Sequence, residues 1–347
     1  MTALLNPPSI AQQSIPAPTE RHDAGIKKAD RWTPVPLSKL SGDGEWKWVW
    51  TGFIARELAT LFVGMFKAGK TTLLSHLFKK METGGDLAGM VDAGKVLVVS
   101  EESPKMWIGR RDSIGIGDHV EVICRPFKGR PSWVEWERFV ERVAALTAEN
   151  SYSLVVIDTI ATFLPVYSEN ESAEMLKALT PLHSITEAGA ALLLVHHPRK
   201  SDGKDGVASR GSGGLPGWVD SFIEFRRYEQ GNQKDCRRVL SNYSRIEGPP
   251  EVIIELTENG FIFAGDAKEV SQSDRIDAML RLGPITAPGL TVDEILLKWD
   301  VAICAKPGLR TLMADLTAAV GNSKLHRTGA GVKGDPFRYT TNAIPPS

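Results

Sequence analysis

The chain has few cysteines, no excess of charge of either sign, and no long apolar run near its first residues. Its three cysteines, Cys124, Cys236 and Cys304, lie far apart and outside any C-x-x-C spacing, which is typical of a reducing, cytoplasmic compartment and argues against a structural zinc site. A formal net charge of −1 gives no field over the whole protein that would attract a polyanion, so a nucleic-acid surface would have to be local. Residues 1–15 lack a basic segment, and their apolar runs are too short to span a bilayer. We therefore expect a cytoplasmic protein that contacts no membrane.

Length and composition predict more than one domain. The chain has 347 residues, whereas single hydrophobic cores stop growing at about 250–300 residues. Residues 1–31 contain four prolines among Ser, Gln and Ala without periodicity, which predicts a disordered N-terminal segment. We expect an α/β core over 32–266, a linker over 267–273 and a small domain over 274–347.

Apolar runs alternate with helix-like segments inside the expected core. Near-continuous Val, Ile and Leu runs are typical of parallel strands that are covered on both faces. Such strands are expected at 58–63, 95–100, 153–157 and 191–195. Helices are expected after the first strand, at 132–149 and at 171–187, where Pro181 predicts a kink or break. Two hairpins, 222–228 with 237–242 and 251–257 with 261–264, flank Gln230-Gly231-Asn232 and Asn259-Gly260 and would extend the sheet with antiparallel strands.

Residues 64–71 match the phosphate-binding motif G-x-x-x-x-G-K-[ST] in full, between an expected strand and an expected helix. Glycines let the backbone N–H groups turn inward around phosphates at a helix N-terminus, where the dipole favours anions. Lys70 would reach the β- and γ-phosphates of ATP, and Thr71 would ligate Mg²⁺. The predicted nucleotide-binding residues are Gly64, Met65, Phe66, Lys67, Ala68, Gly69, Lys70, Thr71 and Thr72.

Acidic residues follow two further expected strands. Asp158 ends the apolar run 153–157, at the strand edge where ligands bind in open α/β sheets. This is the Walker B pattern, which makes Asp158 a predicted Mg²⁺ residue, although an Asp there can also cap the next turn. Glu101 and Glu102 end the strand between the P-loop and Walker B. We assign Glu101 as the base that orients water and leave Glu102 as its alternative; a solvated acidic loop is the other interpretation.

Together these motifs resemble those of the RecA-like ATPases. The chain combines a G-x-x-K-x-G-K-T loop, the Glu after the next strand, the apolar-Asp strand, and Leu-Leu-Leu-Val-His-His-Pro-Arg-Lys at 192–200. It is most similar to the RepA-like hexameric helicases of plasmids and phages, over about 32–265. The resemblance implies a RecA-like, mostly parallel sheet flanked by helices, a hexameric ring or a filament with ATP between subunits, and a γ-phosphate sensor at His196. A structural role for His196 and His197 at the end of a strand is the alternative.

Two further roles depend on the same resemblance. The loop after the sensor strand contacts single-stranded DNA in such rings, which implies this role for residues 198–217, with Arg199, Lys200, Lys204 and Arg210. Two aspartates and the lack of an aromatic residue keep a solvated loop open as an alternative. Arg245 lies where relatives place an arginine finger that acts on the neighbouring subunit. In one register the chain has Ser244 and Ile246 where relatives have Lys-x-Arg, and only Arg245 is matched after a one-residue shift. A surface arginine is the other interpretation.

The C-terminal region predicts three helices, at 275–281, 291–299 and 307–320, and a two-stranded ribbon. This order resembles a winged helix, with 307–320 as the recognition helix and 326–337 as the wing. Basic residues outnumber acidic ones over 301–347, namely Lys306, Arg310, Lys324, Arg327, Lys333 and Arg338 against Asp315 and Asp335. Such a domain usually binds duplex DNA, and docking of a protein is the alternative.

The sequence thus predicts an ATP-hydrolysing DNA helicase or translocase of RepA-like type that acts in DNA replication. Two other classes stay open. One is an ATP-gated DNA-binding regulator or replication accessory ATPase that does not unwind DNA. The other is a RecA-like or KaiC-like recombinase or signalling ATPase.

Overall fold

The computed structural model describes residues 34–39, 44–168, 171–197, 214–229, 232, 234–282, 288–301 and 303–341. The expected N-terminal segment 1–31, most of the expected DNA loop 198–217, and Gln230 and Gly231 of the first hairpin turn lie outside the described residues. The chain divides into two compact units, 1–45 and 46–347, and every element discussed below belongs to the second. None of the described helices is both long and apolar enough to cross a membrane.

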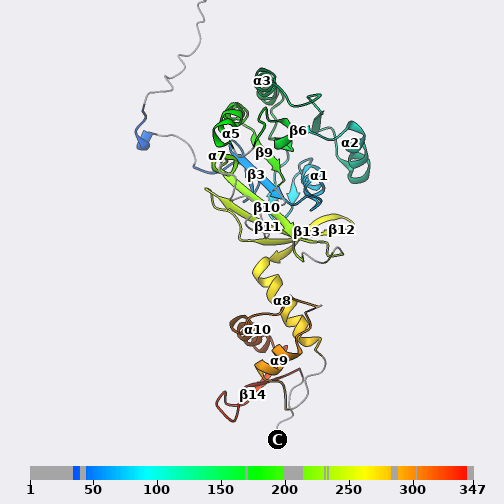
Figure 1. Cartoon of the computed structure of the whole chain (residues 1–347), viewed down its shortest axis with the longest axis vertical. Helices are drawn as coiled ribbons and strands as arrows, with labels where there is room; N and C mark the ends of the chain where they lie inside the picture. The colour runs from blue at the N-terminus through cyan, green and yellow to red at the C-terminus, as the bar shows by residue number, and fades with distance from the viewer. Residues whose placement is uncertain are drawn as a thin grey trace, which may run out of the picture. The chain divides into compact units, whose positions relative to one another are not determined.

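A nine-stranded sheet forms the core, in the order β13-β12-β11-β10-β3-β9-β8-β6-β7 (Figure 1). The six strands from β10 to β7 are parallel, and β11, β12 and β13 extend the sheet as antiparallel strands. Their bounds are β3 Ala59–Gly64, β6 Val96–Ser100, β7 Val120–Cys124, β8 Leu154–Asp158, β9 Ala191–His196, β10 Ser221–Arg227, β11 Arg237–Ser244, β12 Val252–Thr257 and β13 Gly260–Asp266. The four expected parallel strands and both expected hairpins are therefore confirmed.

Helices cover both faces of the parallel strands, as their unbroken apolar sequences require. One face packs against α1, Lys70–Lys80, and α2, Pro104–Arg110, whereas the other packs against α3, Trp133–Asn150, α5, Ser172–Leu179, and α6, His183–Glu187. Short helices α4, Ile160–Phe163, and α7, Gly214–Trp218, complete the core. Ser132 begins α3 with a capping box to Glu135. Pro181 lies in a 3-10 turn between α5 and α6, so the predicted break is confirmed.

Several elements escaped the sequence pattern because they are short or only partly buried. A small antiparallel sheet has the order β2-β1-β5-β4. Its strands are β1 Trp48–Trp50, β2 Ile54–Ala55, β4 Gly85–Asp86 and β5 Met90–Val91. The edge strand β7 is only partly buried along its length, so it lacks the apolar run that revealed its neighbours.

The C-terminal region contains the predicted three helices and ribbon. They are α8 Ala267–Leu280, α9 Val292–Lys298, α10 Leu309–Gly321, β14 His326–Thr328 and β15 Arg338–Thr340, with β14 and β15 antiparallel. Their apolar side chains form a separate core around Met279, Ile295, Leu312 and Leu316. The residues expected to form the linker, 267–273, are helical and make up the first half of α8. All of its side chains except the buried Ala267 are exposed or half-buried, which agrees with a polar sequence in a regular helix.

Candidate nucleotide site

The phosphate-binding loop joins β3 to α1 at the carboxyl edge of the parallel strands. Gly69, which precedes the first residue of α1, has φ +100°, a conformation that L side chains rarely adopt. Gly64 ends β3 beside β10, where a Cβ atom would lie 2.5 Å from the carbonyl oxygen of Phe225. Both glycines are therefore required by the backbone, and the loop places the N-terminus of α1 at the site, where its dipole favours an anion.

Lys70 is buried, with 4% of its surface exposed, and its ammonium is held by loop backbone. Its Nζ lies 2.5 Å from the Gly64 carbonyl oxygen, 3.3 Å from that of Met65 and 2.7 Å from His197 Nδ1. Burial lowers the pKa of Lys70 to about 8, against the attraction of Asp158 and Glu101. A cation that is buried among neutral oxygens gains from an anionic partner, and phosphate oxygens would supply one.

Thr71 and Asp158 meet at the same edge, although 87 residues separate them. The Thr71 hydroxyl donates to Asp158 Oδ2 at 3.2 Å, and Asp158 is buried at the end of β8. Burial, with added repulsion from Glu102 and Glu101, raises the pKa of Asp158 to about 6, while Thr71 and Lys70 oppose the shift. A hydroxyl and a carboxylate are the hard oxygen ligands that Mg²⁺ takes beside a phosphate, so the two residues fit that ion.

The structure gives Glu101 and Glu102 different surroundings. Glu102 forms a two-pronged ion pair with Arg110 of α2, with Arg110 Nη2 to Glu102 Oε1 at 2.7 Å and a second bond to Oε2. Glu101 accepts hydrogen bonds from Thr159 and Thr162, and its charge acts on both Lys70 and Asp158. The charge of Glu102 also acts on Asp158, but of the two acids only Glu101 acts on Lys70, which agrees with the choice of Glu101 as the proposed base.

The two histidines after the fourth expected strand also differ. His196 is the buried last residue of β9, and the alternation of side chains turns it away from the face that carries α1, which receives Val195. His197 lies on the α1 side, 2.7 Å from Lys70 Nζ, and its ring packs 5.2 Å from that of Phe66. Burial, and then the Lys70 charge, lowers the pKa of His197, which favours a neutral ring that accepts from the ammonium. Of the two histidines, His197 is the one that contacts Lys70, whereas the γ-phosphate sensor was expected at His196.

Arg245 lies at the opposite edge of the sheet from the phosphate-binding loop of its own chain. It follows β11, whose last residue, Ser244, pairs with Ser221 at the start of β10, whereas the loop follows the end of β3. Strands of this length separate the two edges by about 20 Å. Its Nη1 lies 3.3 Å from Asp220 Oδ1, and 69% of its side chain is exposed. Arg245 is therefore exposed and lies far from the nucleotide site of its own chain.

Arg238 is a site neighbour that the sequence analysis missed. From β11, its Nε donates to the carbonyl oxygen of Ala68 inside the phosphate-binding loop at 3.0 Å, across 170 residues of sequence. The next residue toward the turn, Arg237, instead binds Asp235 and, at 2.7 Å, Asp274 of α8. No local motif marks Arg238, because only the pairing of β10 with both β3 and β11 brings it to the loop.

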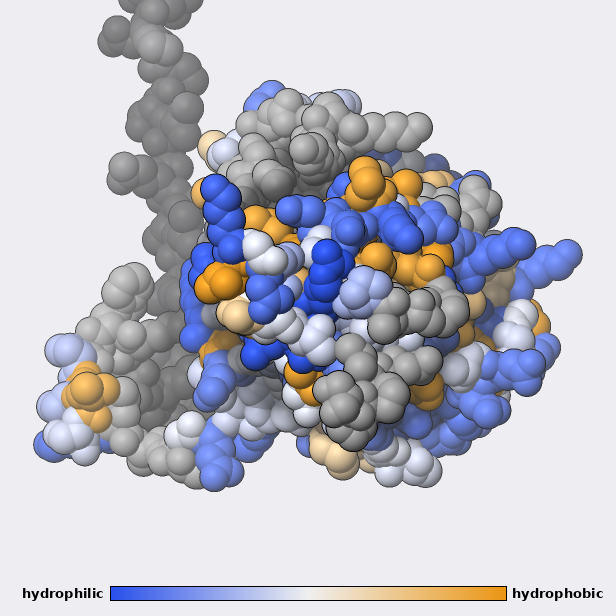
Figure 2. Space-filling view, turned by 90° about the horizontal axis from the view of Figure 1, so that it is seen from below, coloured by the Kyte–Doolittle hydropathy of each residue, from blue (hydrophilic) through white to orange (hydrophobic). Residues whose placement is uncertain are grey.

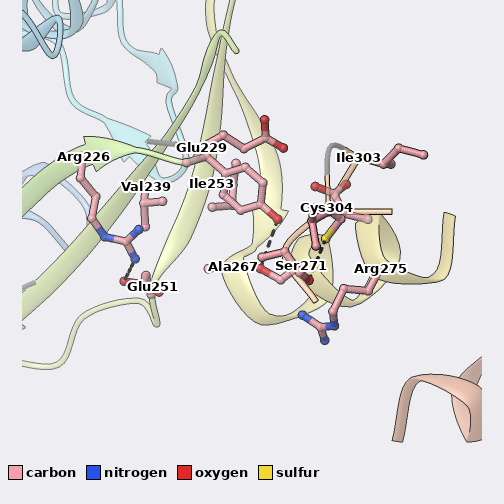
Figure 3. Close-up of a pocket in the computed structure, with 14 residues that line it drawn as sticks. Arg226, Glu229, Val239, Glu251, Ile253, Ala267, Ser271, Arg275, Ile303 and Cys304 are labelled. Carbon is pink, nitrogen blue, oxygen red and sulfur yellow. Dashed lines mark hydrogen bonds and ion pairs between the residues drawn. The ribbon is translucent and has the colours of Figure 1, made fainter. Parts of the chain in front are cut away.

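A cavity of about 460 Å³ lies away from this site, between the antiparallel strands and the start of the C-terminal region (Figure 3). Its charged side chains are paired within the chain: Arg226 with Glu251 at 2.8 Å, and Arg275 with Asp315 at 2.6 Å. The Tyr228 hydroxyl donates to Ser271 Oγ at 3.2 Å. These pairs join β10 and α8 to their neighbours, so the charged side chains that line the cavity are neutralised within the chain.

The comparison with family models agrees with this location. Residues 41–203 match the family model described as AAA domain. The match contains the phosphate-binding loop, Glu101, Asp158 and both histidines, and with the site geometry it supports a P-loop ATPase. Among solved structures, the crystal structure of the RadB recombinase is similar at 17% sequence identity and a TM-score of 0.43, over 60% of this chain and 91% of that chain. Comparison with curated proteins gives no match.

Proposed function

We propose that the chain is an ATP-driven DNA helicase or translocase of RepA-like type that acts in replication, with ATP and Mg²⁺ as cofactors. One observation carries the proposal: Lys70, Thr71 and Asp158 gather at one sheet edge with an acid, Glu101, whose charge acts on two of them. Nucleotide binding needs only the phosphate-binding loop and the metal-binding residues. Hydrolysis also needs an acid beside them that orients the attacking water.

The residues divide the work of hydrolysis. Lys70 exchanges the Gly64 carbonyl and His197 for phosphate oxygens and neutralises the charge that develops on them. Thr71 and Asp158 hold the metal, which when bound supplies charge neutralisation at the phosphates. Glu101 orients the attacking water. We transfer the proposed γ-phosphate sensor from His196 to His197, because His197 is the one that contacts Lys70.

A ring or filament would complete the site from a neighbour. Arg245 is exposed and far from its own loop, as an arginine acting in trans must be. Mixing Arg245→Ala with Glu101→Gln subunits tests this, because each variant keeps the group that the other lacks. Recovered turnover in verified mixed oligomers supports trans action, and the absence of recovery contradicts it.

The C-terminal region, which we propose to be a winged helix, supports DNA contact only in part. Arg338 binds the Gly289 carbonyl oxygen at 3.0 Å and lies 3.5 Å from Glu294, and Lys324 lies 3.5 Å from Asp277. Arg310 and Lys333 are exposed, so these two are better placed to bind phosphates. The expected recognition helix α10 exposes Leu309 and Met313, and Figure 2 shows apolar side chains among hydrophilic ones on the face seen from below.

That apolar exposure favours a second candidate, an ATP-gated regulator or accessory ATPase whose C-terminal domain docks a protein. Strand displacement separates the candidates. We expect the full chain with ATP and Mg²⁺ to unwind a forked duplex, and to form a larger assembly with single-stranded DNA and an ATP analogue, as measured by light scattering. ATP turnover without displacement on any fork would favour the regulator or a recombinase-like or signalling ATPase.

A further inference from the structure

Two threonine hydroxyls converge on one oxygen of Glu101. Thr162 Oγ1 lies 2.5 Å from Glu101 Oε2, and Thr159 Oγ1 lies 3.2 Å from the same atom. The two hydroxyls are also 3.1 Å apart. Both hydrogen bonds that reach the Glu101 carboxylate from described residues therefore fall on Oε2, and Oε1 is left for a water molecule.

The fold holds the donors firmly. Thr159 directly follows Asp158 at the end of β8, and Thr162 lies in α4, whose Ile160 and Phe163 are buried in the core. The backbone N–H of Glu101 also donates to the Asp158 carbonyl oxygen at 2.9 Å. The acid and both threonines are thus fixed to the same pair of adjacent strands, β6 and β8.

Capping of α4 does not explain these contacts. Thr159 occupies the N-cap position of α4, where a threonine usually accepts a hydrogen bond from the first turn, yet its side chain makes no capping bond. The neighbouring acid offers a contrast. Glu102 has both carboxylate oxygens bonded to Arg110, whereas Glu101 has one oxygen bonded and the other available.

We propose that Thr159 and Thr162 are positioning residues for ATP hydrolysis: they fix Oε2 so that Oε1 of Glu101 is aimed at the attacking water. The inference rests on the proposed role of Glu101. A glutamate has several rotatable bonds, and ordering such a side chain costs conformational entropy. Donors that are already in place remove part of that cost from the chemical step, where an error of about 1 Å can lower the rate about 100-fold.

The test compares Thr162→Val, Thr162→Ser and Thr159→Val in the full chain, by steady-state ATP turnover and by ATP affinity. Thr162→Val keeps the shape of the side chain and removes its donor, so we expect kcat to fall by about 10- to 100-fold with KM changed less than about threefold. Thr162→Ser restores the hydroxyl and should recover most of kcat. Thr180→Val is the matched control, since the exposed Thr180 binds only the Leu176 carbonyl oxygen of its own helical segment.

Three results would overturn the inference. Wild-type kcat in both valine variants is one. A second is a fall in thermal stability or in ATP affinity that matches the fall in kcat and that serine does not repair, because the role would then be structural. The third is a further loss when Thr162→Val is added to Glu101→Gln, because a residue that acts through Glu101 has nothing left to position. If Glu101→Gln alone turns over normally, the proposed base is wrong and the inference fails with it. An inactive Glu101→Gln beside normal Thr162→Val and Thr159→Val variants removes the inference only.

Discussion

Buried charged side chains have different surroundings at two places in the molecule. One is the edge of the core sheet that carries the phosphate-binding loop, called the loop edge below, and the other is the interior of the C-terminal region. At the loop edge, burial works against the charges of Lys70 and Asp158 and shifts the pKa of each toward neutrality. In the C-terminal region, Asp315 is 1% exposed and receives two hydrogen bonds from Arg275, at 2.6 and 3.0 Å, and one from Gln272 at 3.1 Å. A fully bonded buried carboxylate supports a fold, whereas buried charges without such partners indicate a site that awaits a ligand.

Removing the two main chemical groups of the loop edge should give the largest effects. We expect Lys70→Ala to abolish tight ATP binding, because it removes the phosphate-binding cation. Glu101→Gln should bind ATP but lose turnover by at least about 100-fold, because only hydrolysis needs the acid. Nucleotide binding by fluorescence and turnover by phosphate release separate the two. Normal turnover in Glu101→Gln together with a dead Glu102→Gln would reverse the base assignment.

Breaking the buried pair in the C-terminal region should affect stability and not catalysis. Asp315→Ala leaves Arg275, whose side chain is 18% exposed, without its partner, which should cost about 3 kcal/mol of local stability. Hydrogen exchange of α8 and α10 in the full chain measures the loss. The exposed Asp293 of α9 provides the control, with an expected change of at most about 1 kcal/mol for Asp293→Ala. Unchanged exchange in Asp315→Ala would show that the pair is not structural.

At the loop edge, removing the charge of a buried aspartate should instead increase the stability of the fold. The folded pKa of Asp158, about 6, exceeds its ordinary value of 3.8, so the folded protein binds more protons between these values and loses stability as pH rises through them. Asp158→Asn does not titrate. Without nucleotide, it should therefore gain about 1–3 kcal/mol over the wild type above pH 6 and little below pH 4. Urea unfolding at both pH values checks this, and a variant that is less stable at neutral pH would contradict the role of burial.

His196 and His197 should differ in their effects on turnover and on stability. His197→Ala should lower kcat about tenfold, because a group that contacts Lys70 is lost from the phosphate end. His196→Ala, on the other face of the sheet, should act mainly through stability. Turnover and thermal unfolding of both variants separate these effects. A catalytic loss confined to His196→Ala, with normal unfolding, would return the sensor to His196.

Much of the fold could be predicted because its signals are local. The phosphate-binding loop, the apolar strands and the break at Pro181 are each contained in a few consecutive residues. The choice between His196 and His197 needed one further step, since Asp158 pairs with Val195 and side chains two residues apart share a face. The contacts of Arg238 with the loop and of the two threonines with Glu101 could not be predicted from the sequence, because only the order of the strands in the sheet brings these residues to their partners.

The smallest expected effect concerns charge at the surface of the C-terminal region. If that region binds duplex DNA through phosphates, changing Arg310 and Lys333 to Ala should weaken binding by several-fold on unrelated sequences and reduce the salt dependence by up to about two charges. Arg338→Ala should instead loosen the ribbon, because Arg338 holds the Gly289 carbonyl oxygen. Titration of the full chain with duplex DNA at several salt concentrations measures the affinity and its salt dependence. Lys70→Ala serves as the background, to exclude turnover. Binding that ignores salt would contradict phosphate contact. The absence of binding at low salt would contradict it too and would favour protein docking, because Leu309 and Met313 expose an apolar surface on α10.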